Sequence, residues 1–306
     1  MSVCYIFPGQ GSQTVGMGRE LYDNNPRARA VFDEVDAALD NYESEFASRV
    51  TRHASRSLSD IIFNGSMDEL TLTRNVQPAI FAVSAAILAA SENDRFDFVA
   101  GHSLGEYSAL YAANAIGLAD VARILRLRGD AMQAAVPVGV GMVAVVLGLE
   151  MDAVTDICMV AGCEVANDNS PGQVVISGYA NAVTVAMQMA RDRGAKRAMP
   201  LPLSAPVHCS LQEPAAVALK DALRKVEIFA PSVPMISNQT AAPMTDPSEI
   251  RESLVYQMTH GVRWRESVLN MPPLGVTETV EVGPGNVLSG LVTRIAPELA
   301  VKKLEI

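Results

Sequence analysis

The pentapeptide GHSLG at residues 101–105 constrains this chain more than any other segment, because it fits the pattern G-x-S-x-G. The apolar run at residues 96–100 predicts a strand before it, and the residues after it predict a helix. A serine between a strand and a helix is typical of a nucleophile elbow, in which a sharp turn lifts the hydroxyl to the end of a sheet. Side chains at Gly101 or Gly105 would collide with the neighbouring strand. The segment therefore predicts an α/β fold with a nucleophilic Ser103; the alternative is a tight glycine turn with an exposed serine.

The start of the predicted helix can stabilise negative charge near Ser103, because free backbone N–H groups at a helix N-terminus point toward an anion. Leu104, the next residue, would supply one backbone donor to an oxyanion, worth about 3–4 kcal/mol of the barrier. The loop with Gly9 and Gly11 after the first predicted strand can turn another N–H toward the same site. This loop is not a dinucleotide fingerprint, because G-x-G-x-x-G requires glycine where the chain has Thr14.

A nucleophilic serine needs a base, and the chain has four histidines. His102 lies within the elbow, where its side chain should point away from Ser103. His53 lies in a polar stretch, and His260 follows the end of a predicted helix. His208 is the best candidate by position and elimination; the alternative is a structural histidine in a loop. No carboxylate has a motif that marks it as a third member, and a backbone carbonyl could orient the base equally well.

Arg128 is the other candidate for the site. It falls in the predicted helix at residues 118–135 among Ile124, Leu125 and Leu127, so we expect this part of the helix to be buried. A buried arginine needs an anion. That anion is either a substrate carboxylate, which bidentate pairing would select, or the carboxylate of a structural salt bridge.

The order of predicted elements divides the chain into two parts. Strands and helices alternate at both ends, which indicates one parallel-sheet domain made from residues 1–136 and 203–306. Residues 137–202 have the order β-α-β-β-α-β, which predicts a small ferredoxin-like subdomain. The predicted strands are residues 3–7, 96–100, 142–147, 164–167, 173–177, 197–201, 233–237 and 279–282. The predicted helices are residues 27–39, 76–90, 103–115, 118–135, 151–161, 180–193, 212–226, 247–259, 264–271 and 286–295.

Composition excludes several classes of function. A net charge of −10 disfavours non-specific binding to nucleic acid or to an anionic membrane. The most apolar stretch, residues 79–90, is shorter than the roughly 20 residues that cross a bilayer, and the N-terminal residues do not form a signal peptide. The four cysteines form no C-x-x-C pair. We therefore expect reduced, buried thiols in a cytoplasmic protein.

Taken together, these segments resemble the malonyl-CoA:acyl carrier protein transacylase family of fatty-acid synthesis. G-x-S-x-G alone is weak evidence, whereas the extended GHSLGEY together with an N-terminal PGQGSQ is highly specific. The matching segments run in family order over nearly the whole chain. They are FPGQGSQ at residues 7–13, GHSLGEY at 101–107, Arg128-Gly129, NSPGQ at 169–173, PVH at 206–208 and EVGPG at 281–285.

The resemblance implies a hydrolase-like α/β domain with a ferredoxin-like insert, and it implies a role for each candidate residue. Ser103 would be the acylated nucleophile and His208 its base. Arg128 would hold the malonyl carboxylate, and the backbone carbonyl of Gln257 would orient the histidine. The backbone donors of the implied oxyanion hole are Gln10 and Leu104.

The implied reaction moves the malonyl group from malonyl-CoA to the phosphopantetheine thiol of acyl carrier protein through a malonyl-serine intermediate. Thioester exchange needs no metal and no redox cofactor, and we expect none. Water must be kept out of the site, because it would hydrolyse the malonyl-serine intermediate. We expect a cytoplasmic monomer whose partners are malonyl-CoA and acyl carrier protein, without nucleic acid or membrane.

Three other functions remain open at this stage. A serine esterase or thioesterase shares the elbow but would pass the acyl group to water and would have no use for Arg128. A non-catalytic subunit of a synthase would not need both Ser103 and His208. A relative acting in polyketide synthesis or malonate metabolism would keep all three residues. Arg128 does not separate malonyl from methylmalonyl, because one methyl group changes selectivity by only about 1–3 kcal/mol.

Two segments depart from the family pattern. Gln212 stands where the family usually has methionine, and residues 41–58 look longer and more polar than usual, which predicts a surface elaboration. An acidic carrier protein would also need a basic patch on this acidic chain, unless the candidate residues are ordinary solvated charges. The candidates are Arg191, Arg193, Lys196 and Arg197 on the insert, and Lys220, Arg224 and Lys225 across the cleft.

Overall fold

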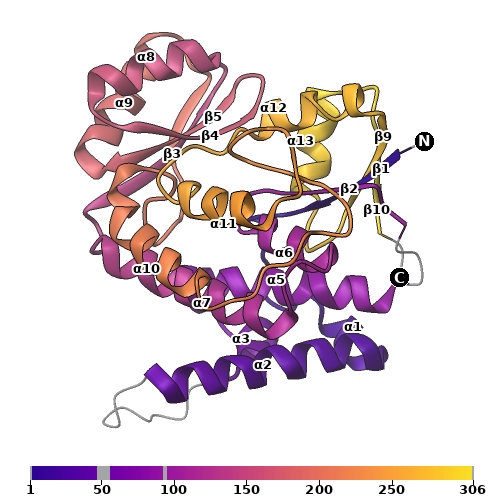
Figure 1. Cartoon of the computed structure of the whole chain (residues 1–306). Coiled ribbons are helices and arrows are strands. Elements are labelled where there is room, and N and C mark those ends of the chain that lie inside the picture. Colours follow the sequence, from indigo (N-terminus) through magenta and orange to yellow (C-terminus); the bar gives the residue numbers. More distant parts are fainter. Residues whose placement is uncertain (1, 47–55, 92–94, 305–306) are drawn as a thin grey trace.

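The computed structural model describes residues 2–46, 56–91 and 95–304, and it contains two β-sheets covered by helices (Figure 1). The larger sheet is parallel except for β8, which pairs antiparallel with β7 at one edge. Across this sheet the strands are β10 (Ala300–Lys303), β9 (Val276–Glu281), β1 (Ser2–Phe7), β2 (Phe98–Gly101), β7 (Met235–Ile236) and β8 (Pro243–Met244).

The central strand β1 is buried on both faces. Tyr5 and Phe7 belong to the core on one side of the sheet, whereas Cys4 and Ile6 belong to the core on the other. This alternation follows from the two-residue period of a strand. The first core is filled by α2 (Pro26–Phe46), α5 (Thr73–Ala90), α6 (Gly105–Ala112), α7 (Leu118–Ala135), α10 (Glu213–Leu223) and α11 (Pro247–Tyr256). The second is filled by α12 (Trp264–Leu269) and α13 (Val287–Ile295).

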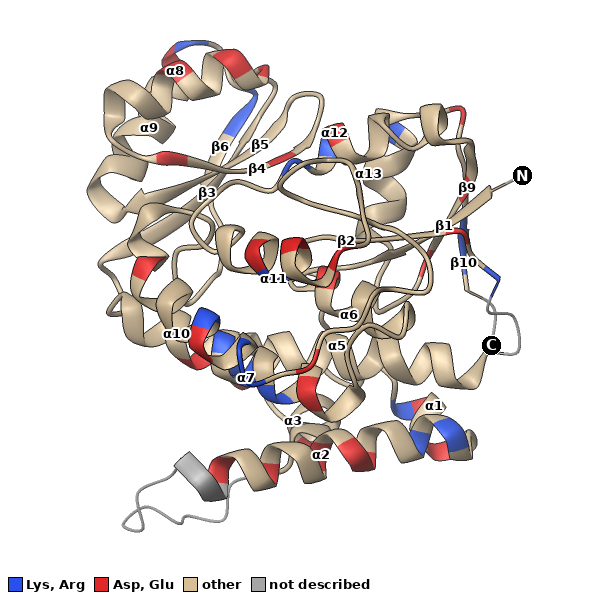
Figure 2. Ribbon diagram, in the orientation of Figure 1, with Lys and Arg blue, Asp and Glu red and all other residues tan. Residues whose placement is uncertain are grey.

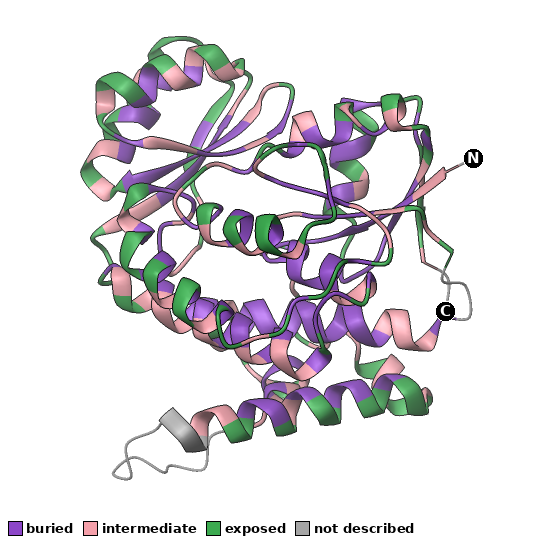
Figure 3. Ribbon diagram, in the orientation of Figure 1, coloured by how far each residue is buried: buried purple, intermediate pink, exposed green. Residues whose placement is uncertain are grey.

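The predicted α/β class with a parallel sheet is confirmed, and the sheet draws strands from both ends of the chain. The sequence missed β8 and β10, and the strand predicted at residues 233–237 is reduced to the two residues of β7. The helix expected from residue 103 begins at Gly105. Figure 3 shows α5 and α6 buried beneath the sheet, whereas α2 keeps one exposed face.

The smaller sheet is antiparallel and has the order β4 (Glu164–Ser170), β5 (Gln173–Tyr179), β3 (Gly141–Leu147), β6 (Arg197–Pro200). Helices α8 (Met151–Ala161) and α9 (Ala180–Asp192) cover one face. Val143, Val145 and Val175 lie on the other face and pack with the segment that follows β6. The predicted β-α-β-β-α-β order is therefore confirmed.

Strand β4 ties the two sheets together. The Asp168 carboxylate forms an ion pair with Arg265 at 2.8 Å, and the Asp168 N–H donates to the carbonyl of Val262. At the end of β5, Gln173 accepts a hydrogen bond from Arg294 at 2.9 Å. These contacts fix the orientation of β4 and β5 above the carboxyl ends of the central strands.

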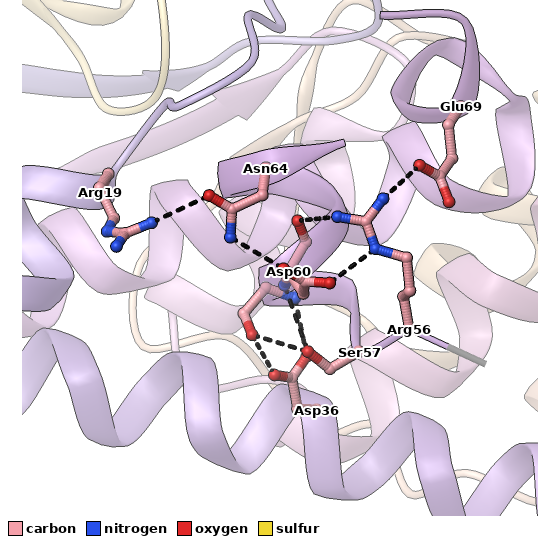
Figure 4. Close-up of polar contacts among 8 residues, drawn as sticks. Arg19, Asp36, Arg56, Ser57, Asp60, Asn64 and Glu69 are labelled. Atoms are coloured by element: carbon pink, nitrogen blue, oxygen red, sulfur yellow. Dashed lines mark hydrogen bonds and ion pairs between the residues drawn. The ribbon is translucent and has the colours of Figure 1, made fainter. Parts of the chain in front are cut away.

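The segment at residues 41–58, where a surface elaboration was expected, is only partly described. Helix α2 runs on to Phe46, and residues 47–55, which include His53, lie outside the described residues. Arg56 then forms ion pairs with Asp60 and Glu69, which joins α3 (Leu58–Asn64) to α4 (Met67–Thr71) (Figure 4). Within the described part of the chain, no helix is both long and apolar enough to cross a bilayer.

Candidate active site

The turn between β2 and α6 places Ser103 at the carboxyl end of the large sheet. Its backbone has a φ of 54°, in the left-handed region that only a constrained turn imposes on a serine. A Cβ atom on Gly105 would lie 2.2 Å from the carbonyl oxygen of Phe7 in β1. A Cβ atom on Gly101 would lie 1.9 Å from the backbone of Gly105, so that the turn itself, and not the neighbouring strand, excludes a side chain there. Both glycines are required for the elbow.

His208 faces the serine hydroxyl. Its Nε2 atom lies 2.8 Å from Ser103 Oγ, and its Nδ1 atom lies 2.7 Å from the backbone carbonyl oxygen of Gln257. A carbonyl can only accept, so Nδ1 carries the proton and Nε2 is free to accept the serine proton. The structure brings together Ser103, His208 and Gln257, which the sequence placed far apart.

The imidazole of His208 is held neutral. The side chain is buried, and removal from water lowers its pKa to about 3, with a smaller contribution from the nearby positive charge of Arg128. The hydrogen bond to Gln257 acts in the opposite direction. Because the imidazole is unprotonated at neutral pH, it can serve as a general base.

Arg128 reaches the same hydroxyl from α7. Its Nη2 atom donates to Ser103 Oγ at 3.3 Å and to the side-chain oxygen of Gln257 at 3.1 Å, and its Nη1 atom donates to Gln77 at 2.5 Å. The guanidinium is 2% exposed, and burial lowers its pKa. Among the described residues no carboxylate forms an ion pair with it. The described residues therefore contain no structural salt bridge to Arg128, which was the alternative that the sequence left open. The carboxylate of a ligand can pair with the guanidinium instead.

Ser103, His208 and Arg128 line one cavity of about 170 Å³ between the two sheets. Gln10 and Leu104 line it beside the serine, and the backbone N–H of neither residue donates to a described group. The polar residues Gln13, His102, Asn167 and Asn169 line this cavity as well. Apolar side chains form another part of its wall. They are Met132 on α7, Val175 on β5, and Leu201, Leu203 and Val207 in the segment after β6.

Comparison with known proteins decides the family. A profile of the acyl transferase domain matches residues 4–295. The malonyl CoA-acyl carrier protein transacylase of Bacillus subtilis is 44% identical over 300 residues, which is 96% of this chain and 90% of the relative. That of Escherichia coli K12 is 39% identical over 98% of this chain and 94% of the relative. This chain belongs to the malonyl CoA-acyl carrier protein transacylase family.

Solved structures of transacylases agree with this assignment. The acyl-carrier-protein S-malonyltransferase of Bartonella henselae is 46% identical, with a TM-score of 0.92 over 100% of this chain and 96% of that one. A malonyl-transacylase solved in complex with a type II polyketide acyl-carrier protein is 35% identical, with a TM-score of 0.91 over 100% of this chain and 97% of that one. The fold of this transacylase family member is therefore that of its relatives along its whole length.

Two further histidines of this transacylase family member, His102 and His260, form no hydrogen bond with the serine hydroxyl. His102 turns toward the small sheet, where its Nε2 atom lies 2.8 Å from the side-chain oxygen of Asn169, so its side chain points away from Ser103 as expected. His260 is exposed, and its ring stacks on that of Tyr256 with the ring centroids 3.4 Å apart.

Several polar residues around the transacylase site were missed by sequence reasoning. Gln77 holds Arg128, Asn238 accepts a hydrogen bond from the Ser103 N–H at 2.8 Å, and Glu106 is buried three residues after the serine. One signal was available. Glu106 is a charged residue in the otherwise apolar and small segment GEYSALYA, and such a residue must find buried donors.

Gln212, which replaces the usual methionine of the transacylase family, is fully buried behind the cavity. Its Nε2 atom donates to the carbonyl of Pro206 at 2.6 Å, two residues before His208, while its Oε1 atom has no described partner. The Gln212 side chain therefore holds the loop that carries His208 by a hydrogen bond.

The basic residues predicted for carrier docking divide into two groups (Figure 2). Arg191 donates to the carbonyl of Ala198, and Arg193 and Arg224 form ion pairs with Asp156 and Asp221. The other group is exposed, and no described carboxylate forms an ion pair with its members. These are Lys196, Arg197, Lys220 and Lys225.

Proposed function

We propose that this protein transfers the malonyl group of malonyl-CoA to the phosphopantetheine thiol of acyl carrier protein, in fatty-acid synthesis in the cytoplasm. The observation that carries the proposal is the convergence of Ser103, His208 and Arg128 on one small cavity, with no described carboxylate forming an ion pair with the arginine. The full-length likeness to malonyl CoA-acyl carrier protein transacylases supports the same substrates. We expect the protein to act as a monomer.

In the first half of the reaction, Ser103 Oγ attacks the thioester carbonyl of malonyl-CoA, and its proton passes to His208 Nε2. The carbonyl oxygen becomes an oxyanion, which we assign to the backbone N–H groups of Gln10 and Leu104. The carbon–sulfur bond then breaks, and the CoA sulfur leaves with the proton from His208. Arg128 pairs with the free carboxylate of the malonyl group throughout.

In the second half, the phosphopantetheine thiol of the carrier attacks the malonyl-serine, and its proton passes to His208. The bond to Ser103 Oγ breaks, and the serine recovers the proton. Nothing is oxidised or reduced, and one thioester replaces another. The apolar walls of the cavity would limit the access of water to the intermediate.

A transfer assay tests this function. The enzyme is incubated with malonyl-CoA, acetyl-CoA or methylmalonyl-CoA and one phosphopantetheinylated carrier protein, and acyl carrier and free acid are both quantified. We expect malonyl to appear on the carrier much faster than acetyl. Release of free malonate without transfer would instead identify a thioesterase, and absence of any reaction would indicate a non-catalytic subunit.

A second candidate is the same transfer to a carrier of polyketide synthesis. The observation that favours it is the likeness to the malonyl-transacylase solved with a type II polyketide acyl-carrier protein. The first half of the reaction is identical in both functions, so only the carrier protein distinguishes them. Comparing kcat/KM for a fatty-acid carrier with kcat/KM for a polyketide carrier therefore separates the two functions.

A further inference from the structure

A buried carboxylate lies behind the site and takes no part in the proposed chemistry. Glu106 is 0% exposed and occupies the first turn of α6, three residues after Ser103. No lysine or arginine in the described chain forms an ion pair with it. An isolated buried charge is costly, so its hydrogen-bond partners must compensate. Burial raises the pKa of Glu106 to about 7, against the opposing effect of those partners and of Arg128.

Two short hydrogen bonds hold this carboxylate. One oxygen of Glu106 accepts from the backbone N–H of Asn238 at 2.6 Å, and the other accepts from the Nε2 atom of Gln257 at 2.6 Å. Both partners are fully buried and come from segments more than 130 positions away. One side chain therefore joins α6, the segment after β7 and the end of α11.

The first partner fixes the nucleophile turn. The side-chain oxygen of Asn238 accepts from the Ser103 N–H at 2.8 Å, and its Nδ2 atom donates to the carbonyl of Gly101 at 2.6 Å. These bonds span the elbow, whose left-handed φ at Ser103 has to be maintained by its surroundings. The bond from Glu106 to the Asn238 backbone holds this residue against the turn.

The second partner fixes the base and the arginine together. The backbone carbonyl of Gln257 accepts from His208, and its side-chain oxygen accepts from Arg128. The amide nitrogen of Gln257 donates to Glu106 and also to the backbone carbonyl of Ser103 at 3.1 Å, so the amide oxygen faces Arg128. If the Gln257 amide were reversed, its NH₂ group would face the guanidinium of Arg128, and two donors would oppose each other.

We propose that Glu106 is a positioning residue for acyl transfer, which holds Ser103 through Asn238 and holds His208 and Arg128 through Gln257. This inference rests on the proposed function for the identity of the acyl group, but not for the activation of the serine. Its effect is on the alignment of the reacting groups, because Glu106 does not line the cavity that they share.

The substitution Glu106→Gln tests this role. An amide of the same shape has one acceptor oxygen, so in either orientation it offers an NH₂ group to one of two donors and loses that hydrogen bond. Misplacement of the reacting groups by about 1 Å can reduce a rate about 100-fold. We expect Ser103 to react roughly 10- to 100-fold more slowly in this variant.

Two rates are measured. The first is labelling of Ser103 by a fluorophosphonate, in which the serine oxygen bonds to phosphorus and fluoride leaves; it reports the activated serine whatever the natural substrate is. The second is single-turnover acylation by malonyl-CoA and by acetyl-CoA. Both rates should fall, and the preference for malonyl should fall as well, because one of the hydrogen bonds that orient the Gln257 amide toward Arg128 is weakened.

Glu281→Gln is the matched control. Glu281 is also a buried carboxylate, 1% exposed, but it accepts from Leu288 and Ser289 at the start of α13 and contacts no residue of the site. Thermal unfolding is recorded for each variant. We expect the control to label at the wild-type rate, even where its melting temperature falls as much as that of Glu106→Gln.

The outcomes distinguish the positioning role of Glu106 from the proposed malonyl transfer. A loss of labelling beyond about threefold in folded Glu106→Gln, but not in Glu281→Gln, supports the positioning role, and a smaller loss overturns it. If Glu106→Gln does not fold, Glu106→Asp is tested against the same threefold threshold. Aspartate keeps the carboxylate, but its side chain is one methylene shorter, so both oxygens lie farther from their donors. Labelling of wild-type Ser103 without malonyl transfer would overturn the proposed function and leave this test intact.

Discussion

The Nδ1 atom of His208 lies 2.7 Å from the backbone carbonyl oxygen of Gln257, so a neutral peptide group orients the base. Gln257 caps the C-terminus of α11, where free carbonyls carry partial negative charge. In the proposed mechanism, that charge would stabilise the imidazolium that forms when His208 takes a proton from Ser103. A carbonyl therefore performs the role that a carboxylate has in many serine hydrolases.

The burial of His208 predicts a pH-dependent stability. The pKa of His208 is about 3 in the folded protein, below the ordinary value of 6.5, so the folded state binds fewer protons than the unfolded state between these values. The stability that comes from neutral His208 is complete above pH 6.5 and is lost progressively as the pH falls toward 3. At 1.36 kcal/mol per pKa unit, the full loss is on the order of 5 kcal/mol.

The variant His208→Asn isolates this contribution, because it removes the titrating group but keeps a polar side chain. Urea unfolding of both proteins at pH 7.5, 6.5, 5.5 and 4.5 should show the wild type losing stability relative to the variant as the pH falls. A difference in unfolding free energy that stays constant over this range would contradict the account.

Replacing Arg128 should change the choice of acyl group. The variant Arg128→Ala removes the partner of the malonyl carboxylate, and hydrogen bonds to charged groups contribute about 1.5–3 kcal/mol each. We expect kcat/KM for malonyl-CoA to fall by roughly 10- to 100-fold relative to kcat/KM for acetyl-CoA. Arg128→Lys should restore little, because it lacks the paired donors of a guanidinium.

Arg126→Ala is the control for this experiment. Arg126 is buried on the same helix and bonds to Asn75 at 2.7 Å, but it does not line the cavity. Its removal should lower stability without changing the ratio of malonyl to acetyl transfer. An unchanged ratio in Arg128→Ala would remove this arginine from substrate recognition.

The glycines of the elbow should not tolerate any side chain. Alanine at Gly105 would bring its Cβ to 2.2 Å from the Phe7 carbonyl, which neither a flexible side chain nor a small shift can relieve. We expect Gly105→Ala to abolish activity and to lower the melting temperature strongly. At Gly290, in α13, an added Cβ meets nothing within 4 Å, so Gly290→Ala should stabilise the fold by about 0.5–1 kcal/mol. Equal melting temperatures in the two variants would contradict this reading of the turn.

The elements that the sequence predicted are those with a long apolar period or a specific turn. The elbow at Ser103 was predicted because its glycines and flanking elements are all local. Strand β8 has two residues, too short for any period, and β10 carries Lys302 and Lys303 at an exposed edge; the strand predicted at residues 233–237 is present only as the two residues of β7. Such strands are defined by their neighbours in the sheet and not by their own residues.

The residues of the site also differ in whether the local sequence or only the fold reveals them. His208 could be proposed because only four histidines had to be compared, and Arg128 because a charge stood in an apolar helix. Gln77 and Asn238 could not be proposed, because amide side chains occur throughout the chain and only the fold shows which of them face Arg128 and Ser103. Gln257 came from the resemblance alone, since any residue can supply a backbone carbonyl.

The exposed basic residues with which no described carboxylate forms an ion pair should affect the second half of the reaction only. Combined charge reversal of Arg197, Lys220 and Lys225 is expected to raise the KM for an acidic carrier protein several-fold at low salt, because complementary charge steers association. Acylation by malonyl-CoA should stay unchanged. Lys303→Glu, at the opposite edge of the large sheet, is the control (Figure 2). An unaltered KM for the carrier in the triple variant would show that docking uses another surface.

The most direct test of the central claim is mass spectrometry of the protein after brief incubation with malonyl-CoA. The account predicts a malonyl group on the peptide that contains Ser103, its absence from Ser103→Ala, and its transfer to the phosphopantetheine thiol when carrier protein is added. Folded wild-type protein that carries no malonyl group, or that carries it on a residue other than Ser103, would contradict the account.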